Sequence, residues 1–194
     1  MTRIVLTEFI SLDGIMEEPR WTFQFERGPE GMNFKSEELF GSDALLLGRV
    51  TYQGFAQAWP SMGTDDFGKR MNSIPKYVVS ATLADSDATW GPTTVLRGDP
   101  VAEITRLKDQ PGGDLLAEGS CQLAHTLIRH GLVDEYRLMV FPIVLGAGKR
   151  LFPERVLESA TLTLTEAKPD RDGVMLYRYQ PAPAKAPATD GIPE

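Results

Sequence analysis

The sequence predicts an α/β protein with one mixed, mostly parallel sheet of eight strands flanked by helices. Short apolar runs rich in β-branched residues alternate with segments of helical periodicity, which is typical of parallel strands joined by helical crossovers. Eight such runs can be counted. The last two are joined by a short Asp172-Gly173 turn that leaves no room for a crossover, so part of the sheet must be antiparallel. A chain of 194 residues is expected to form a single domain over residues 1–180.

The first half of the chain carries four of the expected strands. Residues 3–10 are rich in β-branched side chains and end at a turn over residues 11–14. Residues 44–47 are apolar throughout, which predicts a strand at the centre of the sheet. Two further apolar runs, at residues 76–80 and 93–96, are expected to be the third and fourth strands.

Three helices are expected between these strands. Asn33 can cap a helix that ends near Gly41. A second helix is expected to begin at Thr51 and to end at Pro60, because proline cannot continue a helical hydrogen-bond ladder. Thr64 can cap a third, short helix.

A long loop over residues 15–32 separates the first strand from the first helix, and it contains Trp21, Phe23 and Phe25. A loop of this length and composition is expected either to close over a site or to cover one edge of the core.

Two more helices are expected in the second half. Asp99 followed by Pro100 is a strong start signal, and this helix is expected to reach Lys108. Ser120 can cap the next helix, which Gly131 ends.

Four strands complete the expected sheet. They are residues 114–118, 135–141, 161–165 and 174–179. Residues 181–194 are rich in proline and alanine without periodicity, which predicts a disordered tail.

Composition excludes several classes of function. The net charge is −7 and the basic residues are scattered, so no nucleic-acid partner is expected. His125, His130 and Cys121 have no zinc-ligand spacing, so no metal site is expected. No apolar run has membrane-spanning length, and the chain begins directly with a strand, so we expect no membrane association and a cytoplasmic location.

An apolar strand running into Gly48, Arg49 and Thr51 is the first candidate ligand site. Glycine lets a ligand approach the backbone, a helix N-terminus favours an anion, and Arg49 matches phosphate oxygens. Thr51 can cap the helix or donate its hydroxyl group. The alternative is an ordinary strand-to-helix turn with a surface arginine.

Residues 115–122 repeat this pattern, with a strand ending at Gly119 and a helix starting at Ser120. Two such junctions in one sheet can bind the two ends of a dinucleotide at the carboxyl edge of the strands. Many α/β proteins also have such junctions without a ligand. The fingerprint G-x-G-x-x-G of doubly wound dehydrogenases is missing, since Gly146-Ala147-Gly148 is not followed by a helix signal.

Five motifs in order resemble a known family. They are Ser11-Leu12-Asp13-Gly14, Leu47-Gly48-Arg49-x-Thr51-Tyr52, Glu118-Gly119-Ser120, Gly131-Leu132-Val133-Asp134-Glu135 and Pro142-x-x-Leu145-Gly146-x-Gly148-x-x-Leu151-Phe152. The chain is similar, over about residues 2–180, to the dihydrofolate-reductase-like family. That family includes the C-terminal reductase domain of the bifunctional riboflavin-biosynthesis deaminase-reductase. The resemblance implies an eight-stranded mixed sheet, NADPH as cofactor and a homodimer, to which the mostly apolar residues 137–145 lend support.

The resemblance also implies a set of site residues. The expected cofactor-binding residues are Gly48, Arg49, Thr51, Ser80, Thr82, Gly119, Ser120, Gln122 and Leu123. The expected substrate-binding residues are Asp13, Trp21, Phe55 and Leu145. Glu30 is the candidate for the buried catalytic carboxylate of dihydrofolate reductases, whereas Glu37 and Glu38 are expected on the solvent face of their helix. Gly119-Ser120 departs from the two adjacent glycines typical of those enzymes. Because the catalytic carboxylate is not clearly matched in this sequence, the resemblance does not decide whether the substrate is a pterin.

The expected function is an NADPH-dependent reductase that transfers hydride to a small heterocycle of the pteridine or aminopyrimidine type. One alternative is a non-catalytic nucleotide-binding module on the same fold. Another is the riboflavin-pathway 5-amino-6-(ribosylamino)uracil phosphate reductase, in which Lys149 or Arg150 could bind the substrate phosphate.

Overall fold

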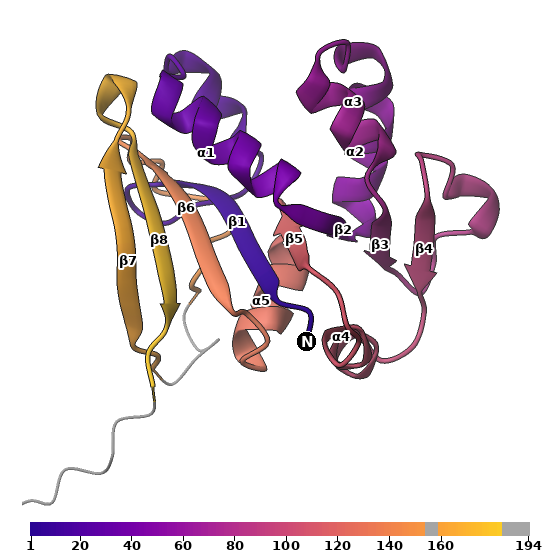
Figure 1. Ribbon diagram of the computed structural model, residues 1–194. Helices are drawn as coiled ribbons and strands as arrows, with labels where there is room; N and C mark the ends of the chain where they lie inside the picture. The colour runs from indigo at the N-terminus through magenta and orange to yellow at the C-terminus, as the bar shows by residue number, and fades with distance from the viewer. Residues whose placement is uncertain (154–158, 184–194) are drawn as a thin grey trace, which may run out of the picture.

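Eight strands form one sheet in the order β4-β3-β2-β5-β1-β6-β8-β7 (Figure 1). The computed structural model describes residues 1–153 and 159–183. The strands are β1 (Ile4–Ser11), β2 (Ser42–Gly48), β3 (Lys76–Val79), β4 (Thr93–Leu96), β5 (Asp114–Glu118), β6 (Glu135–Phe141), β7 (Leu162–Pro169) and β8 (Met175–Pro181). Strands β1 to β6 are parallel, and β8 is antiparallel to both β6 and β7. The predicted mixed, mostly parallel eight-stranded sheet is confirmed.

Five α-helices and three short 3₁₀ segments connect the strands. They are α1 (Pro29–Phe40), α2 (Arg49–Met62), α3 (Asp66–Ser73), α4 (Pro100–Lys108) and α5 (Cys121–Arg129), with η1 (Pro19–Gln24), η2 (Asp85–Asp87) and η3 (Arg171–Gly173). Helices α1 to α3 cover one face of the sheet and α4 and α5 cover the other (Figure 1). In the described part of the chain, no helix has the length and apolar character needed to cross a bilayer.

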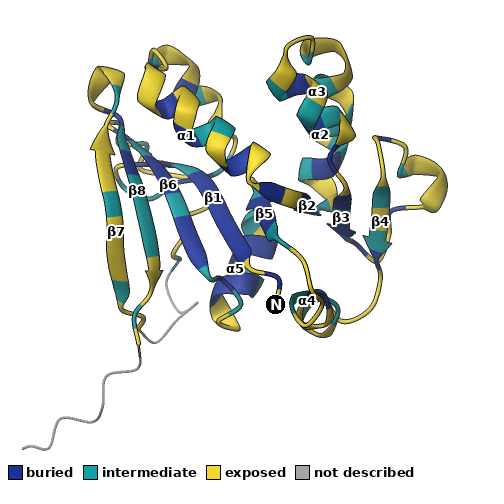
Figure 2. Cartoon of the chain, viewed as in Figure 1, coloured by how far each residue is buried: buried dark blue, intermediate teal, exposed yellow. Residues whose placement is uncertain are grey.

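Alternation along the central strands builds a core on both faces of the sheet. On β1, Ile4 and Leu6 pack with α4 and α5, whereas Val5 packs with the other layer. Burying a side chain of this size contributes about 1.5–3 kcal/mol to stability. Because the buried apolar side chains are concentrated on the central strands, these strands supply most of the stabilisation from burial. Figure 2 shows β1, β5 and β6 as largely buried and β7 as largely exposed.

Strand β7 lies at one edge of the sheet. Its pairing with β8 shifts register between Leu164 and Glu166, and Pro169 ends it. Beyond β8, residues 184–194 of the expected Pro/Ala-rich tail lie outside the described part of the chain.

Helix α1 begins five residues earlier than expected. Gly28 is its N-cap and Pro29 occupies the first helical position, while Asn33 lies inside the helix. The Gly28 N–H donates to Asp170 Oδ2 at 3.0 Å. The first residue of the cap is thus also held by a residue far away in the sequence.

Helix α2 also departs from the prediction at both ends. It begins at Arg49, directly after Gly48, and Pro60 lies inside its last turn. Pro60 cannot donate a helical hydrogen bond to residue 56, and the helix ends two residues later at Met62. The next helix, α3, is capped by Asp65, whose carboxylate accepts from the Gly68 N–H at 2.8 Å, and not by Thr64.

A set of buried polar contacts joins α2, α3 and β3 to the segment before β4. The Trp90 backbone N–H donates to Tyr52 Oη at 2.9 Å, and its indole Nε1 donates to Asn72 Oδ1 at 2.7 Å. Lys76 Nζ donates to Asn72 O at 2.9 Å and lies 4.1 Å from the centre of the Trp90 ring. The ammonium group is thus held over an aromatic face inside the protein.

We expect Lys76 to make stability depend on pH. Burial lowers the pKa of Lys76 from 10.5 to about 8, and the charge of Arg70 acts in the same direction. Between these two values the unfolded chain holds this proton and the folded chain has released it, so stability rises with pH. Urea unfolding at several pH values should show the wild type gaining stability relative to Lys76→Met above about pH 8. A difference between the two proteins that stays constant with pH would contradict this.

Candidate functional site

The turns that follow β2 and β5 touch each other at one edge of the sheet. The two strands are paired in parallel, with Leu46 opposite Ala117. Beyond the strands, the Gly48 N–H donates to Ser120 Oγ at 2.8 Å. The Ser120 hydroxyl group donates to Thr51 Oγ1 at 2.9 Å, and the Thr51 hydroxyl group donates to Gly119 O at 3.1 Å. The two turns predicted from the sequence therefore form one continuous structure.

Glycine suits both turns because the contact between them leaves little room for a side chain. A Cβ atom on Gly48 would lie 3.2 Å from Ser120 Oγ, and a Cβ atom on Gly119 would lie 3.2 Å from Thr51 Cγ2. Gly119 also has a φ of +69°, which other residues rarely adopt. The small size of the two glycines allows the turns to pack against each other.

Both turns lead directly into helices. The first N–H groups of α2 and α5 have no carbonyl partner within their own helix, and the helix dipole makes these ends positive. Two anion-attracting helix ends thus meet at the carboxyl edge of the sheet.

Ser120 and Thr51 do not cap their helices as expected. Ser120 is the N-cap residue of α5, but its side chain makes no capping hydrogen bond. Gly48 is the N-cap of α2, and Thr51 lies inside that helix. Both hydroxyl groups are used instead for the contact between the turns, which capping propensity alone cannot anticipate.

Arg49 lies at the first position of α2 and is exposed. Its guanidinium group donates to Gln53 Oε1 at 3.1 Å, and it forms no ion pair with any residue of the described chain. Its charge is therefore available to a ligand at the mouth of the two turns.

The remaining predicted cofactor residues surround the same edge in different ways. Ser80 follows β3, whose Val79 pairs with Gly48, but the Ser80 hydroxyl oxygen accepts from the N–H groups of Thr82 and Leu83. Thr82 and Gln122 are exposed. Leu123 is buried in the core beneath α5, so its side chain does not face a ligand.

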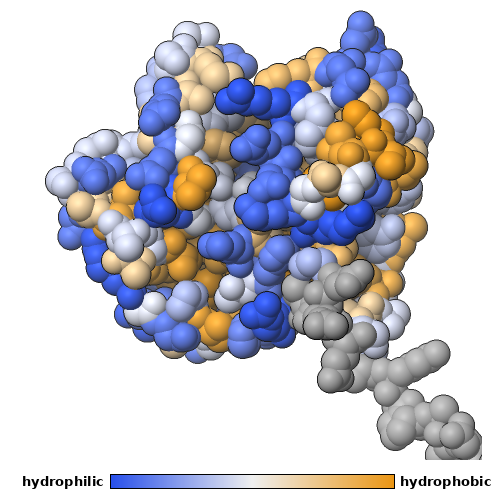
Figure 3. Space-filling model, turned by 180° about the vertical axis from the view of Figure 1, so that it is seen from behind, coloured by the Kyte–Doolittle hydropathy of each residue, from blue (hydrophilic) through white to orange (hydrophobic). Residues whose placement is uncertain are grey.

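An open cavity of about 440 Å³ lies beside α2. Its lining residues are Tyr52, Gln53, Ala56, Gln57, Asp87 and Thr89. Because Gln53 also bonds to Arg49, the cavity adjoins the first turn. Seen from behind, a hydrophilic band runs down the middle of the molecule, below an indentation between two lobes (Figure 3).

Asp13 and Leu145 hold two loops together. The Asp13 carboxylate accepts from the N–H groups of Leu145 at 3.1 Å and Gly146 at 2.9 Å, and from Ser11 Oγ at 2.6 Å. These hydrogen bonds, that of Ser11 first, lower the pKa of Asp13 to about 2. In this structure the Asp13 carboxylate therefore binds the backbone of the loop that contains Leu145 and Gly146.

The other two predicted substrate residues lie in separate aromatic groups. Trp21 packs edge-on against Phe141 of β6, with ring centres 5.6 Å apart. Phe55 packs edge-on against Trp59 and Trp90. The structure therefore does not bring the four predicted substrate residues into one pocket, and Trp21 covers an edge of the core.

Glu30 is exposed at the start of α1 and is not a buried carboxylate. The buried carboxylate of this helix is Glu38, which is 0% exposed, so its expected place on the solvent face was wrong. Thr7 donates to Glu38 Oε1 at 2.8 Å, and Lys35 Nζ lies 2.7 Å from Glu38 Oε2. Lys35 Nζ also donates to Glu118 Oε1 at 3.0 Å. We call Thr7, Lys35, Glu38 and Glu118 the lysine–carboxylate cluster.

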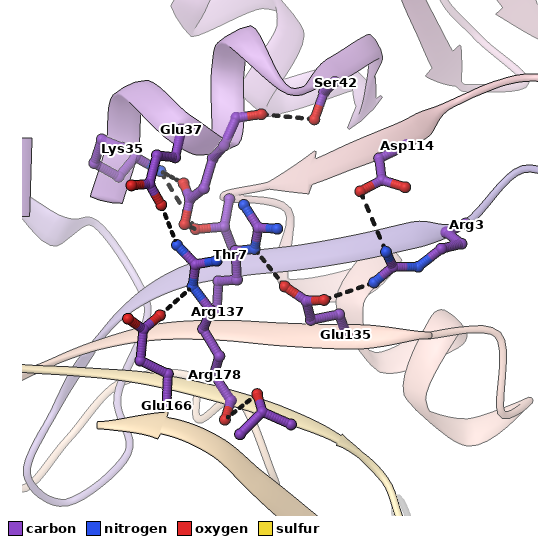
Figure 4. A network of polar contacts seen from close by, with 12 residues as sticks. Arg3, Thr7, Lys35, Glu37, Ser42, Asp114, Glu135, Arg137, Glu166 and Arg178 are labelled. Carbon is purple, nitrogen blue, oxygen red and sulfur yellow. Dashed lines mark hydrogen bonds and ion pairs between the residues drawn. The ribbon is translucent and has the colours of Figure 1, made fainter. Parts of the chain in front are cut away.

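This cluster continues into a wider network of charges under α1. Figure 4 shows Lys35 and Glu37 on α1 above Thr7 of β1, with Arg137 and Glu135 on β6 and Arg178 on β8. Arg178 Nε lies 2.7 Å from Glu166 Oε2, and Arg137 Nε lies 2.6 Å from Glu135 Oε1. The charged network therefore spans several strands on this face.

Glu8 is a second buried carboxylate that the sequence analysis missed. It is 4% exposed, and its Oε1 accepts from the Gly119 N–H at 3.0 Å. Burial, followed by the negative charge of Glu118, raises the pKa of Glu8 well above its usual range. A charged residue within the apolar run of the first strand was the signal that could have identified it.

Lys149 and Arg150 already have acidic partners. Lys149 Nζ lies 2.5 Å from Glu17 Oε1. Arg150 bonds to the backbone carbonyl of Asp13 and lies 3.7 Å from its carboxylate. In this structure both cations are partly exposed and paired with acidic residues of the N-terminal loop.

The amino-acid sequence is similar to that of known proteins. A sequence profile of the RibD C-terminal domain matches residues 2–176. The uncharacterized protein YyaP of Bacillus subtilis strain 168 is 30% identical over 181 residues, covering 91% of this chain and 94% of its own.

Three solved structures share the fold. A putative riboflavin biosynthesis protein from Shewanella sp. PV-4 has a TM-score of 0.74 and 20% identity, over 93% of this chain and 99% of its own. A bifunctional deaminase and 5-amino-6-(5-phosphoribosylamino)uracil reductase from Thermotoga maritima has a TM-score of 0.66 and 12% identity, over 93% of this chain and 57% of its own. Dihydrofolate reductase from Enterococcus faecalis, complexed with NADP(H), has a TM-score of 0.61 and 16% identity, over 93% of this chain and 97% of its own. The profile match spans nearly the whole sheet, and the chain belongs to the RibD C-terminal domain family.

Proposed function

We propose that this protein is an NADPH-dependent reductase that transfers hydride to a small heterocycle of the pteridine or aminopyrimidine type. The observation that carries the proposal is the contact between the Gly48 and Gly119 turns, which joins two helix N-termini at one edge of the sheet. Membership of the RibD C-terminal domain family supports a reductase-type function. The similar dihydrofolate reductase was solved with NADP(H), which favours this coenzyme here.

The residues at the two turns fit a dinucleotide. The N-termini of α2 and α5 and the exposed Arg49 would hold its phosphates. The 440 Å³ cavity beside α2 has the volume of a small-molecule site and would take one end of the coenzyme. Bound NADPH supplies the hydride, and the chain has to orient the two reactants and exclude water.

The lysine–carboxylate cluster is the proposed place of the heterocycle. The side chains of Lys35 and Glu118 are 12% and 19% exposed, so they reach the surface at the end of β5. An ammonium donor and a carboxylate acceptor side by side match the mixed donors and acceptors of a pteridine or an aminopyrimidine.

Two alternatives are less well supported. The riboflavin-pathway reductase needs a site for its substrate phosphate, but Lys149 and Arg150 are paired with acidic residues. A non-catalytic nucleotide-binding module would use the same turns, and it leaves the buried lysine–carboxylate cluster without a role. A steady loss of NADPH absorbance with folate, pterin or aminopyrimidine substrates separates the reductase from the binding module.

A homodimer remains a proposal based on the family. The apolar residues 137–145 that suggested it belong largely to β6, which lies between β1 and β8. Their apolar character is explained within one chain.

NADPH should stabilise the folded protein. A ligand that binds the native state at one hundred times its Kd adds about 2.7 kcal/mol, which raises Tm by several degrees. Thermal unfolding with NADPH, with NADH and without coenzyme measures this effect. An unchanged Tm with both coenzymes at millimolar concentration would refute the proposed function.

Arg49→Ala should weaken NADPH binding by about 1.5–3 kcal/mol, because a charge-assisted hydrogen bond to phosphate is lost. Arg129→Ala is the matched control, since Arg129 is also exposed but lies at the opposite end of α5. Isothermal titration of both variants gives the comparison. Equal Kd values for wild type and Arg49→Ala would remove Arg49 from the site.

A further inference from the structure

We propose that Glu8 is a positioning residue that sets the Gly119 turn, and that ionisation of Glu8 weakens the binding of a phosphate-bearing coenzyme there. This inference rests on the proposed function for the identity of the coenzyme. The anchoring of the turn itself can be tested without any coenzyme.

Glu8 lies directly beneath the turn. In the parallel pairing of β1 and β5, Thr7 lies opposite Glu118, so the next residue, Glu8, is level with Gly119. Alternation places the Glu8 side chain on the face covered by α4 and α5, the same face as Leu6 and Ile10. A buried carboxyl group is therefore built into the sheet at the point where the second turn leaves it.

The backbone N–H and the backbone carbonyl of Gly119 are each held by a side chain. Its N–H donates to Glu8 Oε1 at 3.0 Å, and its carbonyl oxygen accepts from Thr51 at 3.1 Å. The φ of +69° at Gly119 is fixed by these two contacts. The Gly119 N–H points into the protein toward Glu8, so a ligand must use the amides of the following helix turn.

The charges around Glu8 are mostly negative. The charged groups that act on Glu8 are Glu118 on β5 and Lys35 and Glu38 on α1. On the side of α5, Cys121 feels the charge of Glu8 together with those of Lys149 and Glu17 from the adjoining loops. Burial and Glu118 favour the neutral acid, whereas Lys35 and the Gly119 N–H favour the carboxylate. Burial is the largest effect, so Glu8 keeps its proton at a higher pH than an ordinary glutamic acid.

Protonation of Glu8 and anion binding must therefore favour each other. A neutral Glu8 accepts from Gly119 without adding charge, whereas an ionised Glu8 places a negative charge beneath the phosphate site, where screening is weak. The affinity for NADPH should fall as pH rises through the pKa of Glu8. Glutamine at this position keeps the acceptor oxygen and cannot ionise.

The first test follows the Gly119 amide by NMR in the free protein between about pH 5 and pH 9. In the wild type its chemical shift should titrate with Glu8. In Glu8→Gln the signal should keep its position without titrating, and in Glu8→Leu it should move and exchange faster, because the N–H has lost its acceptor. A Gly119 amide that behaves identically in wild type and Glu8→Leu would overturn the positioning role.

The second test measures the Kd of NADPH over the same pH range. The wild type should lose about tenfold in affinity relative to Glu8→Gln as Glu8 ionises. Ionisation of the coenzyme phosphate is common to both proteins and cancels in the ratio. Glu8→Leu should bind more weakly than Glu8→Gln at every pH.

Glu135→Gln is the matched control. Glu135 is also buried, but it lies at the start of β6 and pairs with Arg3 and Arg137. Its replacement should leave the pH dependence of NADPH binding as in the wild type. Parallel pH profiles for wild type and Glu8→Gln would overturn the linkage.

The two proposals fail in different ways. A wild type that binds NADPH with no difference from Glu8→Gln retains the proposed function and overturns the linkage. A wild type that does not bind NADPH overturns the proposed function and the linkage together, and the Gly119 amide still decides whether Glu8 positions the turn.

Discussion

The hydrogen bond between the Gly48 amide and the Ser120 hydroxyl group is the constraint on which the site depends. It joins residues 72 positions apart in the sequence and ties the exit of β2 to the exit of β5. Parallel pairing of the two strands brings the exits together, and glycine at each one lets them touch. The two helix N-termini are aligned on one edge as a consequence of this contact.

A second layer of contacts supports the first from inside the sheet. Glu8 holds the Gly119 amide from below, and Lys35 bridges Glu38 and Glu118 beside it. Buried charges of this kind are tolerated when each finds a partner, and removing one partner is then strongly destabilising. The proposed coenzyme site and the proposed substrate site are thus joined by two adjacent residues, Glu118 at the end of β5 and Gly119 in the turn that follows it.

Much of the fold could be predicted from local patterns, because apolar alternation and Gly or Pro signals reside within a few residues of each element. The start of α1 was missed although Pro29 at its first position is a local signal, because Asn33 offered a capping side chain nearby, and the contact of Gly28 with Asp170 is visible only in the fold. The two glycine turns after β2 and β5 were recognised for the same local reason. The buried carboxylates Glu8 and Glu38 were missed because a charged residue is ordinarily assigned to solvent, and their partners lie on other elements.

The edge strand β7 carries a further consequence for the behaviour of the protein in solution. An uncovered strand exposes unpaired amides and carbonyls that invite pairing with other chains and, eventually, aggregation. The register shift after Leu164 bends this edge, Glu166 and Lys168 place charges along it, and Pro169 removes a donor. These features allow a long, exposed strand to border the sheet without becoming a template for fibril growth.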